Sequence, residues 1–185
     1  MSERIYPHVD VCMMSPFKSS RNGQKIKLIV VHATASHNYK GLRDLQAIGG
    51  WFQNPSAQVS AHACTDNEGH SARYVADTDK AWHCAQYNGV SLGIEQILPG
   101  NGREITDAMY RETARWLALW SKRHGVRLYK GRTLGGRVVL SGVVRHSDLG
   151  TAGGNHNDPG PNYNLAKVLR YARRYRRLMR RQEKK

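Results

Sequence analysis

Short apolar runs separated by polar stretches recur along the chain. The run KIKLIVVH at residues 25–32 is apolar and rich in β-branched side chains, which is typical of a buried strand. Similar runs predict strands at 58–65, 72–76 and 91–97, and RVVLSGVVRH at 137–146 predicts a further short strand with its approach loop. The turn sequence DNEG lies between the segments 58–65 and 72–76, so we expect these two strands to pair as a hairpin.

Helical spacing of apolar residues appears at three places. The strongest pattern covers residues 107–124, where Thr106 suits the N-cap and Gly125 suits the position after the last turn. A weaker helix is expected at 41–53, and another after Asn164. Strands interleaved with helices predict an α/β fold, with a central mixed β-sheet flanked by helices.

The length of 185 residues fits one domain with short extensions. We expect an N-terminal extension at 1–24, a single folded domain at 25–175 and a basic tail at 176–185. No apolar run reaches the roughly 18 residues that a membrane helix needs, and the N-terminus lacks the apolar stretch of a signal peptide. The expected site of synthesis is therefore the cytoplasm, without an export signal.

The positive charge is concentrated near the C-terminus. The formal net charge is +15, and residues 167–185 hold ten of the 29 lysines and arginines. Such a segment attracts polyanions, which include nucleic acid, anionic lipid and anionic wall polymers. Charge alone does not choose among them. Cys12, Cys64 and Cys84 are too few and too widely spaced for a disulfide framework, so reduced, structural thiols are expected.

Two histidines and one aspartate occupy positions suited to a metal ion. His32 and His146 each end an apolar run, and Asp158 follows twelve residues after the second histidine. Two imidazoles and one carboxylate make a three-ligand zinc set that leaves a fourth position open for water. Taken singly, a histidine at a strand end is more often structural, and an aspartate before Pro-Gly is usually turn chemistry.

Glu95 is a candidate general base. Alternate residues of a strand share one face, and Ser91 and Gly93 are small, so this face has room beside Glu95. Apolar neighbours would raise the pKa of the Glu95 carboxyl group toward the range useful for proton transfer. The alternative is a half-exposed glutamate in a surface ion pair. His156 could stabilise an oxyanion, or it could be a mobile loop histidine.

Six segments taken in order are similar to one known family. They are IVVHATAS, VSAHACTDNEG, AWHC, NGVSLGIEQ, RHSDLG and HNDPGP, and they lie within residues 25–163. This series resembles the type-2 N-acetylmuramoyl-L-alanine amidases, which include phage endolysins, bacterial muropeptide amidases and animal peptidoglycan recognition proteins. The resemblance implies their fold, a mixed sheet with flanking helices and a zinc ion (Zn2+) in a surface cleft.

The resemblance also implies roles for particular residues. The three metal positions of the family fall on His32, His146 and Asp158. Glu95 falls on the position of a catalytic glutamate, and His156 on a position where other members carry a lysine. Some phage members use a tyrosine where this chain has Ala61, so a tyrosine-assisted mechanism is not expected and Glu95 becomes the better base.

The implied activity is hydrolysis of the amide bond between N-acetylmuramic acid and L-alanine in peptidoglycan. The expected setting is a phage endolysin that reaches the wall after release. The alternatives are a cytoplasmic muropeptide-recycling amidase and a non-catalytic peptidoglycan-binding module; the complete ligand set favours catalysis. Candidate substrate contacts are Thr34, His62, His83, Asn88 and Ser91. We expect a monomer, a basic tail suited to an anionic wall polymer or anionic lipid, and no nucleic-acid partner.

Overall fold

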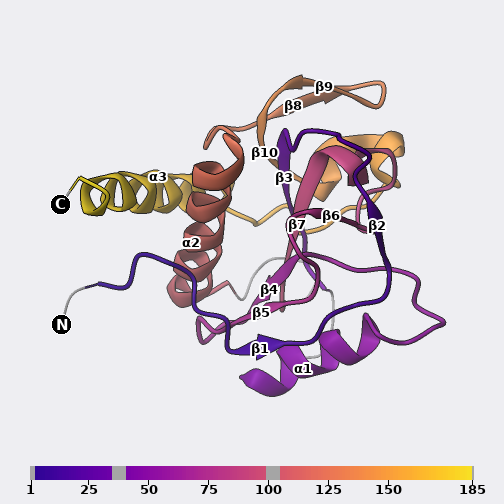
Figure 1. The fold of residues 1–185 in the computed structure, drawn as a ribbon, viewed down its shortest axis with the longest axis horizontal. Helices are drawn as coiled ribbons and strands as arrows, with labels where there is room; N and C mark the ends of the chain where they lie inside the picture. Colours follow the sequence, from indigo (N-terminus) through magenta and orange to yellow (C-terminus); the bar gives the residue numbers. More distant parts are fainter. Residues whose placement is uncertain (1–2, 35–40, 99–104, 185) are drawn as a thin grey trace.

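A six-stranded β-sheet forms the middle of the protein (Figure 1). The computed structural model describes residues 3–34, 41–98 and 105–184. In order across the sheet the strands are β1 (Val11–Cys12), β5 (Ser71–Arg73), β4 (Ala63–Thr65), β7 (Ser91–Gln96), β3 (Leu28–Val31) and β10 (Gly142–Arg145). Only β4 and β5 are antiparallel within this sheet. The mixed sheet and the β4–β5 hairpin confirm the predictions.

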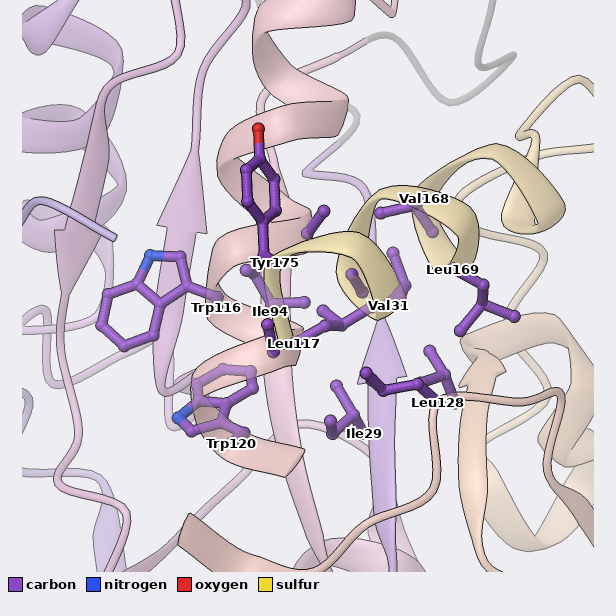
Figure 2. Close-up of a cluster of buried hydrophobic side chains, with 14 of the residues drawn as sticks. Ile29, Val31, Ile94, Trp116, Leu117, Trp120, Leu128, Val168, Leu169 and Tyr175 are labelled. Carbon is purple, nitrogen blue, oxygen red and sulfur yellow. The ribbon is translucent and has the colours of Figure 1, made fainter. Parts of the chain in front are cut away.

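Helices cover the sheet. They are α1 (Leu42–Trp51), α2 (Asp107–His124) and α3 (Leu165–Gln182), with the 3₁₀ helices η1 (Ala85–Val90) and η2 (His146–Gly153). The largest apolar cluster joins α2 and α3 to one sheet face, and Figure 2 shows Trp116, Leu117 and Tyr175 of these helices around Val31 and Ile94. The flanked-sheet architecture is therefore confirmed.

The ends of α2 and α3 follow their capping residues. The Thr106 hydroxyl accepts a hydrogen bond from the Met109 backbone N–H at 3.1 Å, and Gly125 ends α2 with a left-handed φ of 71°. The Asn164 side chain accepts from the Lys167 N–H at 2.9 Å and begins α3. Both caps match the sequence-based expectations because a cap depends on local residues only.

Strand β3, an interior strand of the sheet, has an apolar layer on each of its two faces. Ile29 and Val31 face α2 and α3, whereas Leu28 and Val30 face the side covered by η1 and η2. Side chains alternate along a strand, so His32, which follows Val31, is in phase with Val30. The alternation therefore places His32 on the side of the 3₁₀ helices.

The segment expected as an N-terminal extension is part of the domain. Ile5 is buried in the main core, and Val11 in β1 pairs in parallel with Ala72 in β5. A second small sheet pairs β2 (Lys18–Ser20) with β6 (Asp79–Ala81). These strands are only two or three residues long, and their partners are distant in sequence, so the hydrophobic pattern gives no signal for them.

The C-terminal helix also crosses the expected domain boundary. Helix α3 continues to Gln182, and Met179 is completely buried in the main core. Met179 follows Tyr175 by four residues, so it extends the same apolar stripe. The proposed division at residue 175 thus falls inside a docked helix, and the arginines of this segment occupy its other sides.

The remaining differences are local. The run at 137–146 divides at Ser141 into β9 (Arg137–Leu140) and β10, and β9 pairs with β8 (Arg132–Leu134) in a separate hairpin. The polar runs ATASHNYK at 33–40 and LPGNGRE at 98–104 predict loops, which lie largely outside the described residues because these omit 35–40 and 99–104. All three cysteines are unpaired thiols. No helix in the described ranges is both long and apolar enough to span a bilayer.

Candidate active site

Three adjacent parallel strands bring the main candidate residues to one edge of the sheet. Val31 pairs with Ile94 on one side and with Arg145 on the other. The next residue of each strand therefore lies at the same level, and these residues are His32, Glu95 and His146. All three side chains also project from the face of the sheet opposite α2 and α3. They therefore meet on the side that η1 and η2 cover.

Asp158 completes the cluster from the loop after η2. The Nδ1 atoms of His32 and His146 are 3.0 Å apart, and Asp158 places Oδ1 2.9 Å from His146 Nδ1 and Oδ2 3.3 Å from His32 Nδ1. Two backbone hydrogen bonds hold the aspartate: the Ser147 N–H donates to its carbonyl at 3.0 Å, and the Ala33 N–H donates to Oδ2 at 3.2 Å.

The other ring nitrogen of His146 determines its tautomer. His146 Nε2 is 2.9 Å from the carbonyl oxygen of Gly153. A carbonyl can only accept, so the proton lies on Nε2 and Nδ1 keeps its lone pair. Such a bond to the outer nitrogen is the usual way in which a protein orients a metal-binding imidazole.

A chain of hydrogen bonds gives His32 the same tautomer. The Ser91 hydroxyl donates to the Tyr87 carbonyl at 2.7 Å, which leaves its oxygen to accept from His83 Nε2 at 3.1 Å. His83 Nδ1 then accepts from His32 Nε2 at 2.9 Å. His32 Nδ1 is consequently unprotonated and turned toward Asp158.

This donor set fits a divalent cation. The three ligand atoms lie within 4.8 Å of one another, and atoms bound tetrahedrally at roughly 2.0–2.1 Å from zinc would be about 3.3 Å apart. Burial lowers the pKa of His32 to about 4, although the neighbouring Asp158 carboxylate acts in the opposite direction. Burial alone would raise the pKa of Asp158, but its contacts with His146 and His32 hold that pKa well below its usual range. Two lone pairs and a carboxylate thus converge, which a cation would stabilise.

Glu95 lies in the same cavity with an unusual environment. Its Oε2 is buried and has no hydrogen-bond partner in the described part of the chain, although the residue as a whole is partly exposed. Burial, and secondarily the charge of Asp158, raises the pKa of Glu95 well above its ordinary value. A carboxyl group with a raised pKa is a stronger base than an ordinary carboxylate, so it is better suited to accept a proton from water.

The cluster forms the floor of a cavity of about 660 Å³. Thr34, His83 and Asn88 line this cavity, and their contact with substrate stays a prediction. An apolar wall of α1 and its neighbours, which sequence reasoning did not single out, comprises Ile48, Trp51, Phe52, Val59 and Trp82. Trp51 is 49% exposed, and its position at the end of an amphipathic helix was the available signal for a binding surface.

His156 lies at the mouth of the cavity. Its ring stacks on the His146 ring with centroids 4.3 Å apart and an interplanar angle of 15°. Its Nδ1 is 3.8 Å from Asp158 Oδ1, and 58% of the side chain is exposed. The imidazole therefore has one face against a candidate ligand and an edge available to a molecule in the cavity.

Two expected substrate contacts do not reach the cavity. His62 is fully buried, accepts from the Gly93 N–H at 2.9 Å through Nδ1 and places Nε2 3.1 Å from the Asp79 carbonyl oxygen. Ser91 is also fully buried, beneath His83. The room that Gly93 provides is likewise used by His83, since a Cβ at residue 93 would lie 2.6 Å from its Nδ1. Both assignments are corrected to internal structural roles.

Comparison with known proteins gives sequence relatives. Residues 22–161 match the family model described as N-acetylmuramoyl-L-alanine amidase. The chain is 34% identical over 121 residues to N-acetylmuramoyl-L-alanine amidase A of Achromobacter lyticus. That alignment covers 60% of this chain and 66% of the relative, which is just under two thirds of the relative's length.

Solved structures share the fold. AmiA of Staphylococcus aureus is 18% identical with a TM-score of 0.70, covering 94% of this chain and 85% of its own. AmpD is 20% identical with a TM-score of 0.66, covering 92% and 98%. The endolysin LysCS of Clostridium intestinale is 15% identical with a TM-score of 0.59, covering 87% and 94%. At these identities the similarity establishes the architecture.

Proposed function

Because this chain belongs to the N-acetylmuramoyl-L-alanine amidase family, we propose that it hydrolyses the amide bond between N-acetylmuramic acid and L-alanine in peptidoglycan, with zinc as its metal ion. The observation that carries the proposal is the convergence of two imidazole lone pairs and a carboxylate beside the unpartnered oxygen of Glu95. This arrangement provides metal ligands and a proton carrier in one cavity.

The residues divide the reaction among them. His32, His146 and Asp158 would hold the zinc ion, which when bound supplies a Lewis acid that polarises the amide carbonyl and lowers the pKa of water. Glu95 accepts a proton from the attacking water and delivers it to the leaving nitrogen of L-alanine. His156 directs its exposed edge to the oxygen on which negative charge develops.

The apolar wall of the cavity positions the substrate. Trp51 and Trp82 line the same cavity as the ligand cluster, and rings of this kind bind the apolar faces of extended substrates. Thr34 adds a polar group beside them. One wall of the cavity is aromatic and another is polar. This difference would determine the orientation in which the muramic acid and the peptide bind.

The proposed biological setting is lysis of the cell wall, as for an endolysin. One of the structures with this fold is named as an endolysin, and the arginine-rich helix α3 gives the protein a basic side suited to an anionic wall. The alternative is a muropeptide-recycling amidase. A preference for intact sacculi over soluble muropeptides of at least tenfold in kcat/KM supports lysis, and the reverse preference supports recycling.

The first experiment identifies the bond and the need for metal. Purified protein is incubated with peptidoglycan, and the products are analysed by mass spectrometry. We expect free stem peptides beginning at L-alanine, loss of the reaction after a chelator and recovery with added zinc. Binding of peptidoglycan without any cleavage would instead support the non-catalytic module, and cleavage of a different bond would reject the proposal.

A substitution of Glu95 separates catalysis from metal binding. Glu95→Gln keeps the shape of the side chain but removes its ability to carry a proton. We expect turnover to fall by roughly 10²–10⁴-fold while bound zinc, measured by elemental analysis, stays at the wild-type level. An equally active Glu95→Gln protein would eliminate the assigned role, and loss of zinc would place Glu95 among the groups that hold the metal.

A further inference from the structure

A second cavity lies between the end of α2 and the flank of α3, away from the candidate active site. Its volume is about 490 Å³, and none of its lining residues lines the first cavity. It is lined by Ser121, Lys122, Gly125, Val126, Arg127, Leu128, Tyr129, Arg173, Arg176, Arg177 and Arg180. Five arginines and one lysine therefore face a single hollow, and no acidic residue is among these lining residues.

The charges of this cleft are only partly compensated. Lys122 forms an ion pair with Glu183, whose pKa is also lowered by the nearby Arg176 and Arg180. Arg173 donates one hydrogen bond, at 2.9 Å, to the Leu128 carbonyl. Arg176 Nη1 is buried and has no hydrogen-bond partner among the described residues. The rest of the Arg176 side chain is partly exposed and lines the cleft, so its charge is available to an incoming anion.

The packing of α3 explains why the arginines gather there. The apolar stripe of the helix is completely buried in the main core, through Val168, Ala172, Tyr175 and Met179. The flank beside this stripe therefore faces the end of α2. Arg173 and Arg180 are seven residues apart, which corresponds to about 10 Å along a helix. The row is long enough for several successive anionic groups.

We propose that this cleft binds a linear polyanion whose charges are phosphate groups. Arginine suits phosphate because its planar guanidinium donates two parallel hydrogen bonds and keeps its charge. The cationic row along α3 presents such groups at successive turns of one rigid helix. The inference is independent of the proposed amidase activity, because the two cavities share no residues.

The surroundings disfavour two other polyanionic partners. Insertion into a membrane surface requires an exposed apolar helix face, and the apolar face of α3 is buried against the domain. Single-stranded nucleic acid is usually held by aromatic platforms that stack on bases. The lining has one aromatic residue, Tyr129, and the Arg173 guanidinium already lies over its ring at 5.6 Å from the centroid. A phosphate chain without bases fits better.

Binding of linear inorganic polyphosphate to the full chain tests the proposal. The cleft variant is Arg176→Gln/Arg177→Gln/Arg180→Gln, and the matched control is Arg170→Gln/Arg174→Gln/Arg181→Gln, whose arginines are exposed and do not line the cleft. Both lose three charges. Isothermal titration at several salt concentrations should show at least a tenfold weaker Kd and a smaller salt dependence for the cleft variant, with the control within threefold of wild type.

Parallel titrations with phosphatidylglycerol vesicles and single-stranded DNA, at equal phosphate concentration, distinguish the sources of phosphate. Tighter binding to vesicles or DNA than to polyphosphate, an equal loss in both variants, or no binding by wild type would overturn the proposal. Because Arg176 is partly buried, Arg177→Gln/Arg180→Gln serves as a second variant that leaves it unchanged. Its Kd should also weaken, by at least threefold, while cleavage of a soluble muropeptide by all variants remains at the wild-type rate.

Discussion

The buried histidines of this protein differ in which ring nitrogens form hydrogen bonds with other groups of the protein. His62 uses Nδ1 to accept from a backbone N–H, and its Nε2 faces a backbone carbonyl. His83 likewise uses both nitrogens, between His32 and Ser91. Only His32 and His146, among the fully enclosed rings described, turn an unprotonated nitrogen toward Asp158. Hydrogen bonding therefore distinguishes the candidate metal-binding pair from a larger group of buried imidazoles.

The burial of His62 makes folding stability depend on pH. Burial, assisted by the charge of Arg21, lowers the pKa of His62 to about 3, whereas an unfolded histidine titrates near 6.5. Between these values the unfolded chain binds a proton that the folded chain does not. Stability from this group is therefore complete above pH 6.5 and is lost as the pH falls toward 3, with a loss of roughly 1 kcal/mol by pH 5.5.

We expect His62→Gln to reduce this pH dependence. The free energy of unfolding, measured with urea at pH 7.5 and pH 5.5, should fall less between the two conditions in the variant than in wild type. His32 and His83, whose pKa values burial also lowers, keep the remaining dependence in both proteins. An unchanged difference between the two pH values would mean that His62 accepts a proton in the folded state.

At the scale of an element, the strand β7 controls how closely the neighbouring loop approaches. Gly93 lies directly beneath His83, where a Cβ would be 2.6 Å from the ring Nδ1. The ring packs there because no side chain intervenes, and from that position His83 accepts the hydrogen bond that orients His32. A glycine in this strand thus supports the candidate ligand cluster without touching it.

Gly93→Ala should weaken zinc binding. The added methyl group would displace His83 and break its hydrogen bond to His32, so we expect a 10–100-fold loss of zinc affinity in a competitive chelator titration. Gly50→Ala is the matched control, because nothing lies within 4 Å of a Cβ at Gly50 in helix α1. The control should bind zinc like wild type. Unchanged zinc affinity in Gly93→Ala would show that His83 does not orient the ligand.

At the scale of the whole molecule, the first and last segments that the structure describes pack into the domain. The N-terminal segment ties α2 through Arg4, whose guanidinium donates to the fully buried Glu112 carboxylate at 2.7 Å. The preceding residue, Glu3, accepts hydrogen bonds from Arg174 and Tyr175 of α3, near the other end of the chain. The N-terminal segment of the described chain therefore contacts both α2 and α3, which lie side by side (Figure 1).

Met179 tests whether the last turns of α3 contribute to this packing. Its side chain is completely buried, so Met179→Ala should lower the free energy of unfolding by about 2–5 kcal/mol in a urea titration. Arg181→Ala, at an exposed position of the same turns, should change it by no more than about 0.5 kcal/mol. Equal stability of the two variants would indicate a tail that does not dock.

The sequence by itself determined the elements that depend on local chemistry. The ends of α2 follow from Thr106 and Gly125, and the central strand follows from its β-branched apolar run. Alternation along the strands also determined which side chains share a face, and the order of motifs indicated the three candidate ligands. These features depend on residues close in sequence, or on a pattern that homologous chains share.

Only the tertiary structure decided what covers each face. Alternation places Ser91 and Gly93 on the side of Glu95, but it cannot show that His83 fills that space from another segment. The same holds for His62, for the short strand β1 and for the docking of Met179. Each depends on contacts between residues far apart in the chain, whose free energy arises only when the packed core brings them together.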